Sequence, residues 1–319
     1  MENAEFIIEN DVLLKYNGKA ETVIIPDGVK EISADAFKEC YYTKKIVIPQ
    51  GVTELAWGAF FGCRNLYEVV LPEGLKRIAD FAFMNCEKLE QVNIPQSVEY
   101  IGQSAFCGCR YLHRARLADG LQVLGDYAFS DCRFLAELQL GGQLETIGEY
   151  AFQGCEDLSA VKIPESVRKI GESAFRCCYG LKQLELPESL EVLGWRSFEG
   201  CGSLTAVKIP AVKVFGGFAF CACSSLAELE FAQGLEKIGD SVFRDCTSLE
   251  QVVLPDSVRE IARYAFIGCK NLKEIYIPET VTDLGDDVFG GCENLTIYGK
   301  AGTAAAAYAE KNNIAFAVR

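Results

Sequence analysis

Apolar residues recur along this chain with a period of 23 residues. A phenylalanine marks each of twelve units, and every step between successive phenylalanines is 23 residues except one step of 22. A cysteine stands three residues after each phenylalanine, and a leucine follows three residues later in eleven units, with Thr43 as the exception. The twelve phenylalanines are Phe37, Phe60, Phe83, Phe106, Phe129, Phe152, Phe175, Phe198, Phe220, Phe243, Phe266 and Phe289. Such self-similarity at a fixed spacing is the signature of a repeat architecture.

The unit that spans residues 66–86 predicts two legs. Val69 and Leu71 alternate with outward positions, which is the period of a short half-buried strand, and Pro72 ends that strand because proline has no amide donor. Apolar residues then return at spacings of three and four over residues 75–83, which indicates a second leg that is partly helical or irregular. One unit therefore has a strand side and a return side.

No single unit can bury its own apolar positions, so neighbouring units must stack. We expect an α/β or mainly β solenoid, a right-handed stack of about twelve 23-residue coils with one parallel sheet and terminal caps. In-register strands about 4.8 Å apart make that sheet about 55 to 60 Å long. The one-residue deletion between Pro210 and Val212 falls in a turn, where we expect only local distortion.

The chain ends differ from the repeat and predict caps. Residues 1–25 contain a hairpin pattern that covers the first coil, residues 26–297 form the solenoid, and residues 298–319 form a C-terminal cap. Within that cap, the alanine-rich residues 304–311 favour a helix and residues 314–318 favour a last strand. Length alone favours about two domains, but the repeat predicts one structural domain.

The repeat resembles a known family. Its unit, Leu-x-x-Val/Ile-x-Leu/Ile-Pro-x-x-Val/Leu-x-x-Ile-Gly-x-x-Ala-Phe-x-x-Cys, resembles the BspA-like, or Treponema-type, subclass of bacterial leucine-rich repeats. The resemblance covers residues 6–319, including an entry segment at residues 14–18 and an exit segment at residues 298–302. It implies a leucine-rich-repeat solenoid, and it implies that such a protein binds host or matrix proteins at a cell surface.

Charge and termini limit the partners and the location. The net charge of −14 comes from 31 basic and 45 acidic residues, which argues against nucleic acid and anionic membranes as partners. No apolar run approaches the roughly 18 residues that a membrane helix needs, so we expect no membrane insertion. Residues 1–10 hold three acids and no apolar signal core. As written, the chain predicts a cytoplasmic protein, and a trimmed signal would place it at the cell surface or outside the cell.

Fifteen cysteines suggest redox or metal chemistry, but twelve of them occupy one repeat position. These ladder cysteines are Cys40, Cys63, Cys86, Cys109, Cys132, Cys155, Cys178, Cys201, Cys223, Cys246, Cys269 and Cys292. Adjacent positions lie within the Cα separation that a disulfide allows. We favour the alternative, in which each thiol is a small buried apolar group and remains free.

Three further cysteines, Cys107, Cys177 and Cys221, lie outside the ladder positions. They could form a thiolate metal site, but their spacing does not match a zinc site and they lie in different coils. We expect peripheral free thiols that react before the ladder cysteines. We predict no metal and no cofactor.

The sequence offers no catalytic constellation. His113 is the one histidine, which excludes a metal site with two imidazoles. A nucleophilic pair of Cys109 and His113 would need a third group and an oxyanion site, and neither is indicated, so a solvated surface histidine is the better interpretation. The glycines follow the coil period and form no phosphate loop. We therefore predict that the protein is not an enzyme.

A row of acids precedes the repeated phenylalanines by three residues. Its members are Asp80, Asp126, Glu149, Glu172, Asp240 and Asp286. We expect them to open a short helical turn, where a carboxylate complements the local dipole, although a cation-attracting row is the alternative. Trp57 and Trp195 occupy the same register, and aromatic enrichment at interfaces makes them weak contact candidates.

The outward face of the sheet is the better place for a binding site. The position four residues after each ladder leucine gives Val47, Val70, Asn93, Arg116, Gln139, Lys162, Glu185, Lys208, Glu230, Val253 and Tyr276. Apolar residues lie at both ends of this row, and Arg114 adds a local basic spot in an acidic protein. The candidate partner-binding residues are Val47, Val70, Arg114, Arg116, Val253 and Tyr276. Strand propensity is the alternative reason for the valines.

Three functions remain open at this stage. The first is a non-enzymatic scaffold whose sheet face binds a protein or peptide. The second, implied by the family resemblance, is a secreted or cell-surface adhesin for a host or matrix protein. The third is thiol-dependent catalysis or metal storage, which the cysteine count alone suggests.

Overall fold

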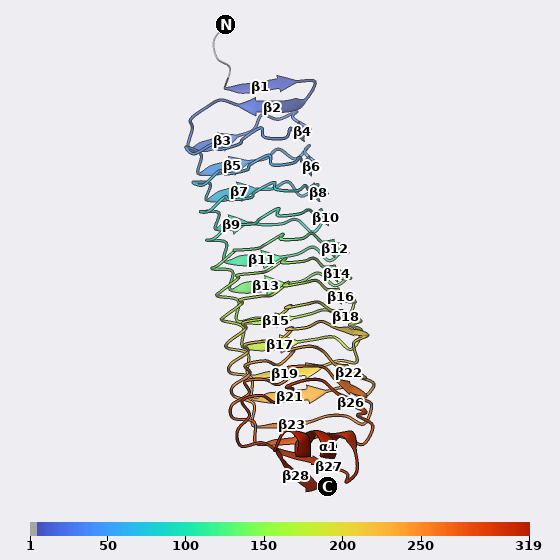
Figure 1. Cartoon of the computed structure of the whole chain (residues 1–319). Coiled ribbons are helices and arrows are strands. Elements are labelled where there is room, and N and C mark those ends of the chain that lie inside the picture. Colours follow the sequence, from blue (N-terminus) through green and yellow to red (C-terminus); the bar gives the residue numbers. More distant parts are fainter. Residues whose placement is uncertain (1–4) are drawn as a thin grey trace. The chain divides into compact units, whose positions relative to one another are not determined.

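The computed structural model describes residues 5–319, and the chain divides into two compact units, Met1–Leu158 and Ser159–Arg319. Each unit is a β-solenoid whose coils repeat about every 23 residues, which confirms the predicted fold class (Figure 1). The first four residues of the predicted N-terminal cap lie outside the described part of the chain. The grouping of caps and solenoid into one domain stays a prediction.

One series of short parallel strands follows the ladder leucine position, as predicted. In unit 1 these are β3 (Thr22–Ile24), β5 (Lys45–Val47), β7 (Glu68–Val70), β9 (Gln91–Val92), β11 (Arg114–Arg116) and β13 (Glu137–Gln139). In unit 2 they are β15 (Ala160–Lys162), β17 (Gln183–Glu185), β19 (Ala206–Ile209), β21 (Glu228–Phe231), β23 (Gln251–Val253), β25 (Glu274–Tyr276) and β27 (Thr296–Gly299). The strands pair in register, so that Val23, Ile46 and Val69 form one buried row.

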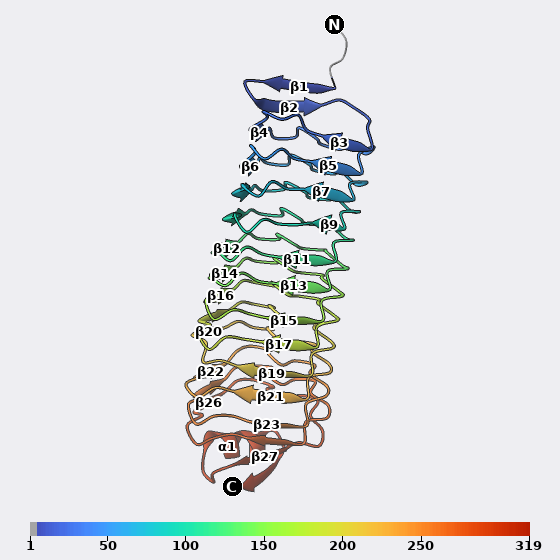
Figure 2. The same ribbon diagram turned by 180° about the vertical axis from the view of Figure 1, so that it is seen from behind.

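A second series of parallel strands, two residues each, was not predicted from the sequence. In unit 1 these are β4 (Glu31–Ile32), β6 (Glu54–Leu55), β8 (Arg77–Ile78), β10 (Tyr100–Ile101), β12 (Val123–Leu124) and β14 (Thr146–Ile147). In unit 2 they are β16 (Lys169–Ile170), β18 (Val192–Leu193), β20 (Val214–Phe215), β22 (Lys237–Ile238), β24 (Glu260–Ile261) and β26 (Asp283–Leu284). Within unit 1 the two series lie on opposite sides of the coils (Figures 1 and 2).

The return leg is irregular and contains no helix. Each coil places a residue in the left-handed region two positions before and two positions after its ladder phenylalanine, for example Phe81 (φ 61°) and Asn85 (φ 60°) around Phe83. These two kinks break helical continuity because left-handed residues cannot extend a right-handed helix. Of the two predicted forms of the second leg, partly helical or irregular, the irregular form is therefore correct.

The prediction that the acidic row opens helical turns is wrong for the same reason. The carboxylates act on the neighbouring coil instead. Asp80 Oδ1 accepts a hydrogen bond from the Gln103 amide at 2.9 Å, and Asp126 Oδ1 accepts one from the Glu149 amide at 2.8 Å. Each carboxylate thus satisfies a backbone donor that the irregular turn leaves exposed.

The ladder phenylalanines form the centre of each core. In unit 1 their successive ring centroids lie 5.0 to 5.6 Å apart, and in unit 2 they lie 5.1 to 5.9 Å apart, with nearly parallel rings. The Phe83 amide also donates to the Ala105 carbonyl of the next coil at 2.7 Å. Stacked rings and inter-coil backbone bonds therefore hold the coils in one register.

The ladder cysteines add a weak bond between coils. Cys109 Sγ donates to the Phe83 carbonyl at 3.2 Å, and Cys132 Sγ donates to the Phe106 carbonyl at the same distance. Each of these thiols fills a small slot and supplies a donor to a buried carbonyl. An alanine in this slot would leave that second interaction unmade.

The N-terminal cap of unit 1 is the predicted hairpin. Strands β1 (Phe6–Glu9) and β2 (Val12–Tyr16) pair antiparallel, and β2 continues into parallel pairing with β4. The Tyr16 ring stacks 5.1 Å from Phe37, in the position of a further ladder phenylalanine. Its hydroxyl donates to Glu5 Oε1 at 2.8 Å, and burial raises the Tyr16 pKa to about 12. A tyrosine suits this place because its ring is apolar and its hydroxyl reaches polar partners at the end of the stack.

Unit 2 ends in the helix and strand that the sequence predicted. These are α1 (Ala304–Lys311) and β28 (Ala315–Val318), and β28 pairs parallel with β27. Tyr308 of α1 contacts Phe289 edge to face at 5.9 Å, and its hydroxyl accepts from the Val288 amide at 2.9 Å. A tyrosine thus ends the phenylalanine stack in each unit.

Two further sequence predictions can be checked against the backbone. The deletion between Pro210 and Val212 is absorbed in a tighter turn, in which the Val212 amide donates to the Pro210 carbonyl at 2.8 Å. In a regular coil the donor amide lies three residues after the proline instead of two, as in the bond from the Val167 amide to the Pro164 carbonyl. Among residues 5–319, no helix has the length and apolar character to cross a bilayer.

Truncation of one interior ring tests the stacking. Phe106 lies between Phe83 at 5.2 Å and Phe129 at 5.0 Å and is fully buried. Phe106→Ala leaves a cavity that should lower the free energy of unfolding by about 3 to 5 kcal/mol in chemical denaturation. Phe134→Ala, at a ring that is 39% exposed, is the matched control and should cost far less. Equal losses for the two variants would contradict a core built on this ladder.

Candidate functional site

An apolar stripe crosses the outward face of unit 1. Ile24, Val47 and Val70 are register partners at the ends of β3, β5 and β7. Ile24 is 68% exposed, Val70 is 38% exposed, and Val47 between them is half-buried. The repeat pattern predicted the two valines but not Ile24, because Ile24 precedes the first complete Phe-Cys-Leu unit. The alternation of outward and inward positions in the strand Thr22–Ile24 is the sequence signal that could have identified Ile24.

The sheet opens next to this stripe, between β9 and β11. At a regular step, the amides of Tyr67 and Glu68 both donate to the Lys44 carbonyl, at 2.7 and 3.1 Å. At the β9 to β11 step, the corresponding amides of His113 and Arg114 reach no backbone carbonyl of the described residues. β9 and β11 accordingly belong to separate sheets. The opening leaves backbone donors that another chain can use.

Side chains around the opening enclose a hollow of about 550 Å³. Its lining residues are Glu90, Gln91, Val92, Asn93, Ile94, His113, Arg114 and Arg116. Ile94 is buried and Val92 is half-buried, so the hollow has apolar contacts as well as polar walls. The structure therefore brings Arg114 and Arg116, both predicted as binding residues, to one concave site.

The two arginines differ in their pairing. Arg114 Nε lies 3.2 Å from Glu137 Oε2, and both side chains are highly exposed. Arg116 is paired in register with the neutral Gln139, and it has no carboxylate within ion-pair distance among residues 5–319. An exposed pair contributes little stability, so Arg114 can exchange partners at small cost. Arg116 is open to an incoming carboxylate or carbonyl group.

Aromatic side chains border the same site. Tyr111 and Phe134 are exposed, with ring centroids 5.1 Å apart, and His113 lies 6.2 Å from Phe134. The prediction of a surface histidine is confirmed, since His113 is exposed and its Nδ1 lies 3.3 Å from the Phe134 carbonyl. Tyr111 and Phe134 were not predicted as site residues because they lie outside the outward row of strand positions.

The polar wall beside β9 has its own hydrogen bonds. Gln91 Nε2 donates to the Tyr67 hydroxyl at 3.4 Å. The negative charge of Glu90 raises the pKa of Tyr67, so the phenol stays neutral and able to donate.

The last two predicted residues lie in unit 2. Val253 and Tyr276 are register partners on β23 and β25. Val253 is 61% exposed, whereas Tyr276 is half-buried and has the Arg319 guanidinium 5.9 Å from its ring centroid. These two residues are therefore neighbours on adjacent strands, and neither of them lines the hollow beside Arg114 and Arg116.

The profile of the BspA type leucine rich repeat region, which contains six repeat copies, matches residues 8–136, 99–226 and 194–299. The chain belongs to this family. A search of curated proteins found no match. The resemblance seen in the sequence is thereby confirmed over most of the length of the chain.

Solved structures of similar bacterial proteins agree with this BspA-type assignment. A leucine-rich repeat protein from Bacteroides ovatus is 26% identical, with a TM-score of 0.63 over 97% of this chain and 94% of that chain. A leucine rich cell surface protein from Faecalibacterium prausnitzii is 28% identical, with a TM-score of 0.59 over 95% and 94%. The pneumococcal vaccine antigen PcpA is 22% identical, with a TM-score of 0.55 over 92% and 78%, and it supports the fold alone.

The cysteines of this BspA-type chain are all free thiols. Burial raises the pKa of Cys109 and Cys132 well above the usual value, so these thiols stay protonated. Among residues 5–319, no group of three or more histidine, cysteine and acidic side chains is placed to hold a metal ion. These observations favour the structural interpretation of the ladder.

The three additional cysteines differ in how deeply they are buried. Cys107 and Cys177 are half-buried, but Cys221 is only 7% exposed, so the prediction of a peripheral thiol is wrong there. Cys221 follows its ladder phenylalanine directly, in a register that the longer Glu199 and Arg244 occupy in the neighbouring coils. Burial is the main cause that raises the Cys221 pKa to about 11.

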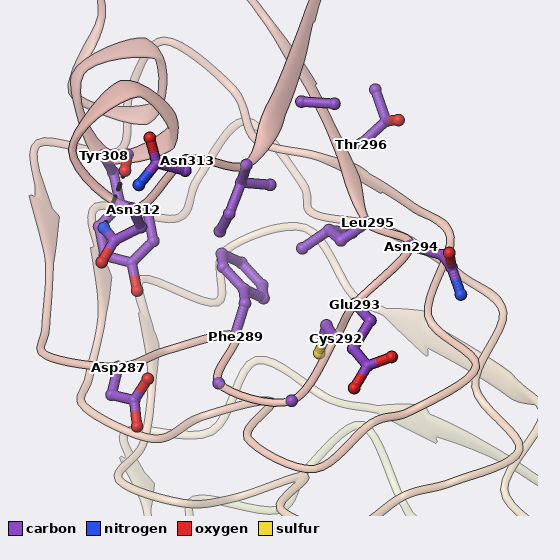
Figure 3. Close-up of a pocket in the computed structure, with 14 residues that line it drawn as sticks. Asp287, Phe289, Cys292, Glu293, Asn294, Leu295, Thr296, Tyr308, Asn312 and Asn313 are labelled. Carbon is purple, nitrogen blue, oxygen red and sulfur yellow. Dashed lines mark hydrogen bonds between the residues drawn. The ribbon is translucent and has the colours of Figure 1, made fainter.

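A second hollow, of about 560 Å³, lies at the C-terminal end of unit 2 (Figure 3). Phe289, Cys292 and Leu295 of the last coil line it together with residues 312–315 after α1. It is the space that a further coil would fill, because the cap replaces that coil with a helix and a single strand. Its acidic and amide groups lie on the rim and converge on no common point, so it is a weaker candidate than the opening in unit 1 (Figure 3).

Thiol labelling at different pH values tests the cysteine assignments. Burial raises the pKa of Cys107 to about 11, so its thiolate fraction should grow about tenfold per pH unit between pH 8 and pH 10. Alkylation of the folded protein, followed by peptide mass spectrometry, should show this rise at Cys107. Cys107 and Cys177, the half-buried thiols outside the ladder, should react before the twelve buried cysteines. A Cys107 rate that levels off near pH 9, as for a cysteine in a short peptide, would refute the assignment.

Proposed function

We propose that the chain is a non-enzymatic protein-binding scaffold that holds an extended segment of a partner on the sheet face of unit 1. The observation that carries this proposal is the open step between β9 and β11, where a hollow of about 550 Å³ joins free backbone donors to two arginines. The β17 to β19 and β21 to β23 steps of unit 2 also divide into separate sheets, so the arginine-lined hollow, and not the missing bonds alone, distinguishes the β9 to β11 step.

The composition of the face supports a protein partner. An apolar stripe of Ile24, Val47 and Val70 lies beside the basic hollow, and exposed aromatic rings border it. Aromatic residues and arginine are the types that carry most binding energy at protein interfaces. The stripe can receive aliphatic side chains while Arg116 binds a carboxylate or a carbonyl group.

The proposal contains no catalytic step. His113 lies against the Phe134 carbonyl, and the ladder thiols are engaged with backbone carbonyls in the core. The family match is to a repeat region, whose usual role is to present a surface.

A second candidate function is adhesion at a cell surface. It is favoured by the similarity to the cell surface protein of Faecalibacterium prausnitzii, which is 28% identical over 95% of this chain. In that case the same face would bind a host or matrix protein. The partner would change, but the residues that contact it would remain those of unit 1.

Site-specific crosslinking tests the face and the partner together. A photoreactive phenylalanine at Val70 or Asn93 should capture a partner protein. Capture from cell extract would support the scaffold function, and capture from a mixture of matrix proteins would support adhesion. Arg114→Gln with Arg116→Gln should lower capture at least tenfold. Lys30→Gln with Lys76→Gln removes the same charge from two exposed ion pairs and should leave capture unchanged. Equal capture by both double variants would dismiss the site.

A further inference from the structure

The corner of the last complete coil of unit 2 has no coil stacked on it. We call this corner, residues 291–295, the end corner, and all five of its residues line the hollow of about 560 Å³ beside the cap. Asn312 and Asn313 of the cap lie across the hollow from Glu293 and Asn294 (Figure 3). The hollow falls within the range of about 300 to 1,000 Å³ that is usual for ligand sites in proteins.

Core side chains of the last coil are slightly open to this hollow. Cys292 is 7% exposed and Leu295 is 4% exposed. Cys269 and Leu272, at the same positions one coil earlier, are fully buried. A ligand in the hollow therefore contacts apolar surface as well as the polar groups on the rim.

Backbone groups of the end corner lack the partners that a following coil supplies. The corresponding amides of the three preceding coils, at Ala222, Asp245 and Gly268, each donate to a carbonyl of the next coil at 2.7 to 2.8 Å. The Gly291 amide reaches no backbone acceptor, and the Glu293 carbonyl reaches no backbone donor, among residues 5–319. A polypeptide segment carries the carbonyl and amide groups that satisfy both.

The charge of the hollow is entirely negative. Asp287 and Glu293 are exposed, and no lysine or arginine belongs to its lining. Within the described part of the chain, neither carboxylate has a basic side chain at ion-pair distance. Burial is the main cause that raises the pKa of Cys292 to about 11, and the Asp287 charge adds to it, so this carboxylate acts on the interior of the hollow. Charge complementarity therefore favours a basic ligand.

An interior corner of unit 1 has the same sequence register. Residues 85–88 correspond to residues 291–294, and both corners place a glutamate directly after the ladder cysteine. The interior corner is followed in the next coil by residues 107–112, with the sequence Cys-Gly-Cys-Arg-Tyr-Leu. Its contacts therefore show what chemistry covers a corner of this type.

Three contacts join this interior corner to the segment that covers it. The Asn85 amide donates to the Cys107 carbonyl at 2.8 Å, and the Tyr111 amide donates to the Glu87 carbonyl at 3.2 Å. The Arg110 guanidinium lies 4.0 Å from the Glu87 carboxylate. One short segment thus supplies a carbonyl, an amide and an arginine to the corner, and the end corner lacks a partner for each of the three corresponding groups.

We propose that the end corner of unit 2 is a docking surface for an arginine-containing segment of a partner protein, which lies where the next coil would lie. The arginine pairs with Glu293, and the amide that follows it donates to the Glu293 carbonyl. A carbonyl three residues before the arginine accepts from the Gly291 amide. Neighbouring chains paired in this way lie about 4.8 Å apart, so one extended segment fits the geometry.

A second copy of this chain is a poor occupant of the hollow. Its own residues 107–112 are stacked between neighbouring coils, and its N-terminal hairpin carries Glu9 and Asp11 at the turn. In such a contact these carboxylates would face Asp287 and Glu293, and like charges repel. A separate basic protein avoids this repulsion.

Calorimetric titration with blocked hexapeptides tests the charge preference. The probe Ser-Gly-Ser-Arg-Tyr-Leu follows residues 107–112 with serine at both cysteine positions, and two further probes carry glutamate or leucine in place of the arginine. The arginine probe should bind at least tenfold more tightly than either of the others. Equal binding of the leucine probe would mean that the hollow is only apolar, and tighter binding of the glutamate probe would mean an anion site. Either result would overturn the proposal.

A charge-swap variant locates the binding. Glu293→Lys should reverse the preference, so that the glutamate probe binds more tightly than the arginine probe. Glu228→Lys, at an exposed strand position of unit 2, is the matched control and should keep the original order. Because both side chains are exposed, both variants should retain the thermal transition. The original order of affinities in folded Glu293→Lys protein would refute the site.

Hydrogen exchange tests the backbone bonds of the docked segment. A saturating amount of the arginine probe should slow exchange of the Gly291 amide at least fivefold. The Gly268 amide already donates to the Gly290 carbonyl at 2.7 Å, so its exchange should not change. An unchanged Gly291 rate in the complex would contradict the proposed position of the segment.

Two further measurements separate the alternatives. Arg114→Gln with Arg116→Gln should leave the affinity for the arginine probe unchanged, so failure of the sheet-face proposal and failure of this one are distinguishable. Sedimentation of the protein alone should show no self-association that depends on Glu293. A dimer that Glu293→Lys abolishes would assign the hollow to a second copy and would overturn the proposal.

Discussion

Stacking between neighbouring coils is the interaction on which the rest of the structure depends. A coil of 23 residues has no core of its own, and its apolar side chains become buried only against the coils before and after it. The ladder phenylalanine makes this contact twice, through its ring and through its amide, as at Phe83 with Phe106 and Ala105. The ladder cysteine adds a thiol to carbonyl bond between the same coils. Tyr16 and Tyr308 end the stacks because a tyrosine ring fits the slot while its hydroxyl satisfies polar groups at the end.

Such a regular stack makes every departure from regularity informative. Inward positions are constrained by their neighbours, whereas outward positions on the strands and corners can vary without loss of stacking. The step between β9 and β11 lacks the backbone bonds that steps such as β5 to β7 make, and it combines this gap with a hollow beside Arg114 and Arg116.

The sequence predicted the parts of the fold that depend on repeated side chains. The strand row, the ladder slots, the hairpin and the C-terminal helix follow from periodicity and propensity, and the structure contains them. The second strand series escaped prediction because two residues per coil carry no detectable alternation. Helical turns were expected around Asp80, but left-handed residues such as Phe81 are not encoded by any apolar pattern. Arg114 and Arg116 could be predicted as candidates because two basic residues lie close together in an acidic chain. The hollow beside them could not be predicted, because it depends on missing backbone bonds that the pattern of side chains does not show.

Hydrogen exchange of individual backbone amides tests the central claim, that the open step in unit 1 is the binding site. In the free protein, the amides of His113 and Arg114 should exchange faster than those of Ala136 and Glu137, which donate to the His113 carbonyl at 3.0 and 3.2 Å. Addition of the crosslinked partner, purified, should slow exchange at His113 and Arg114 first. Equal protection in the free protein, or a footprint that leaves residues 90–94 and 113–116 unchanged, would contradict the account.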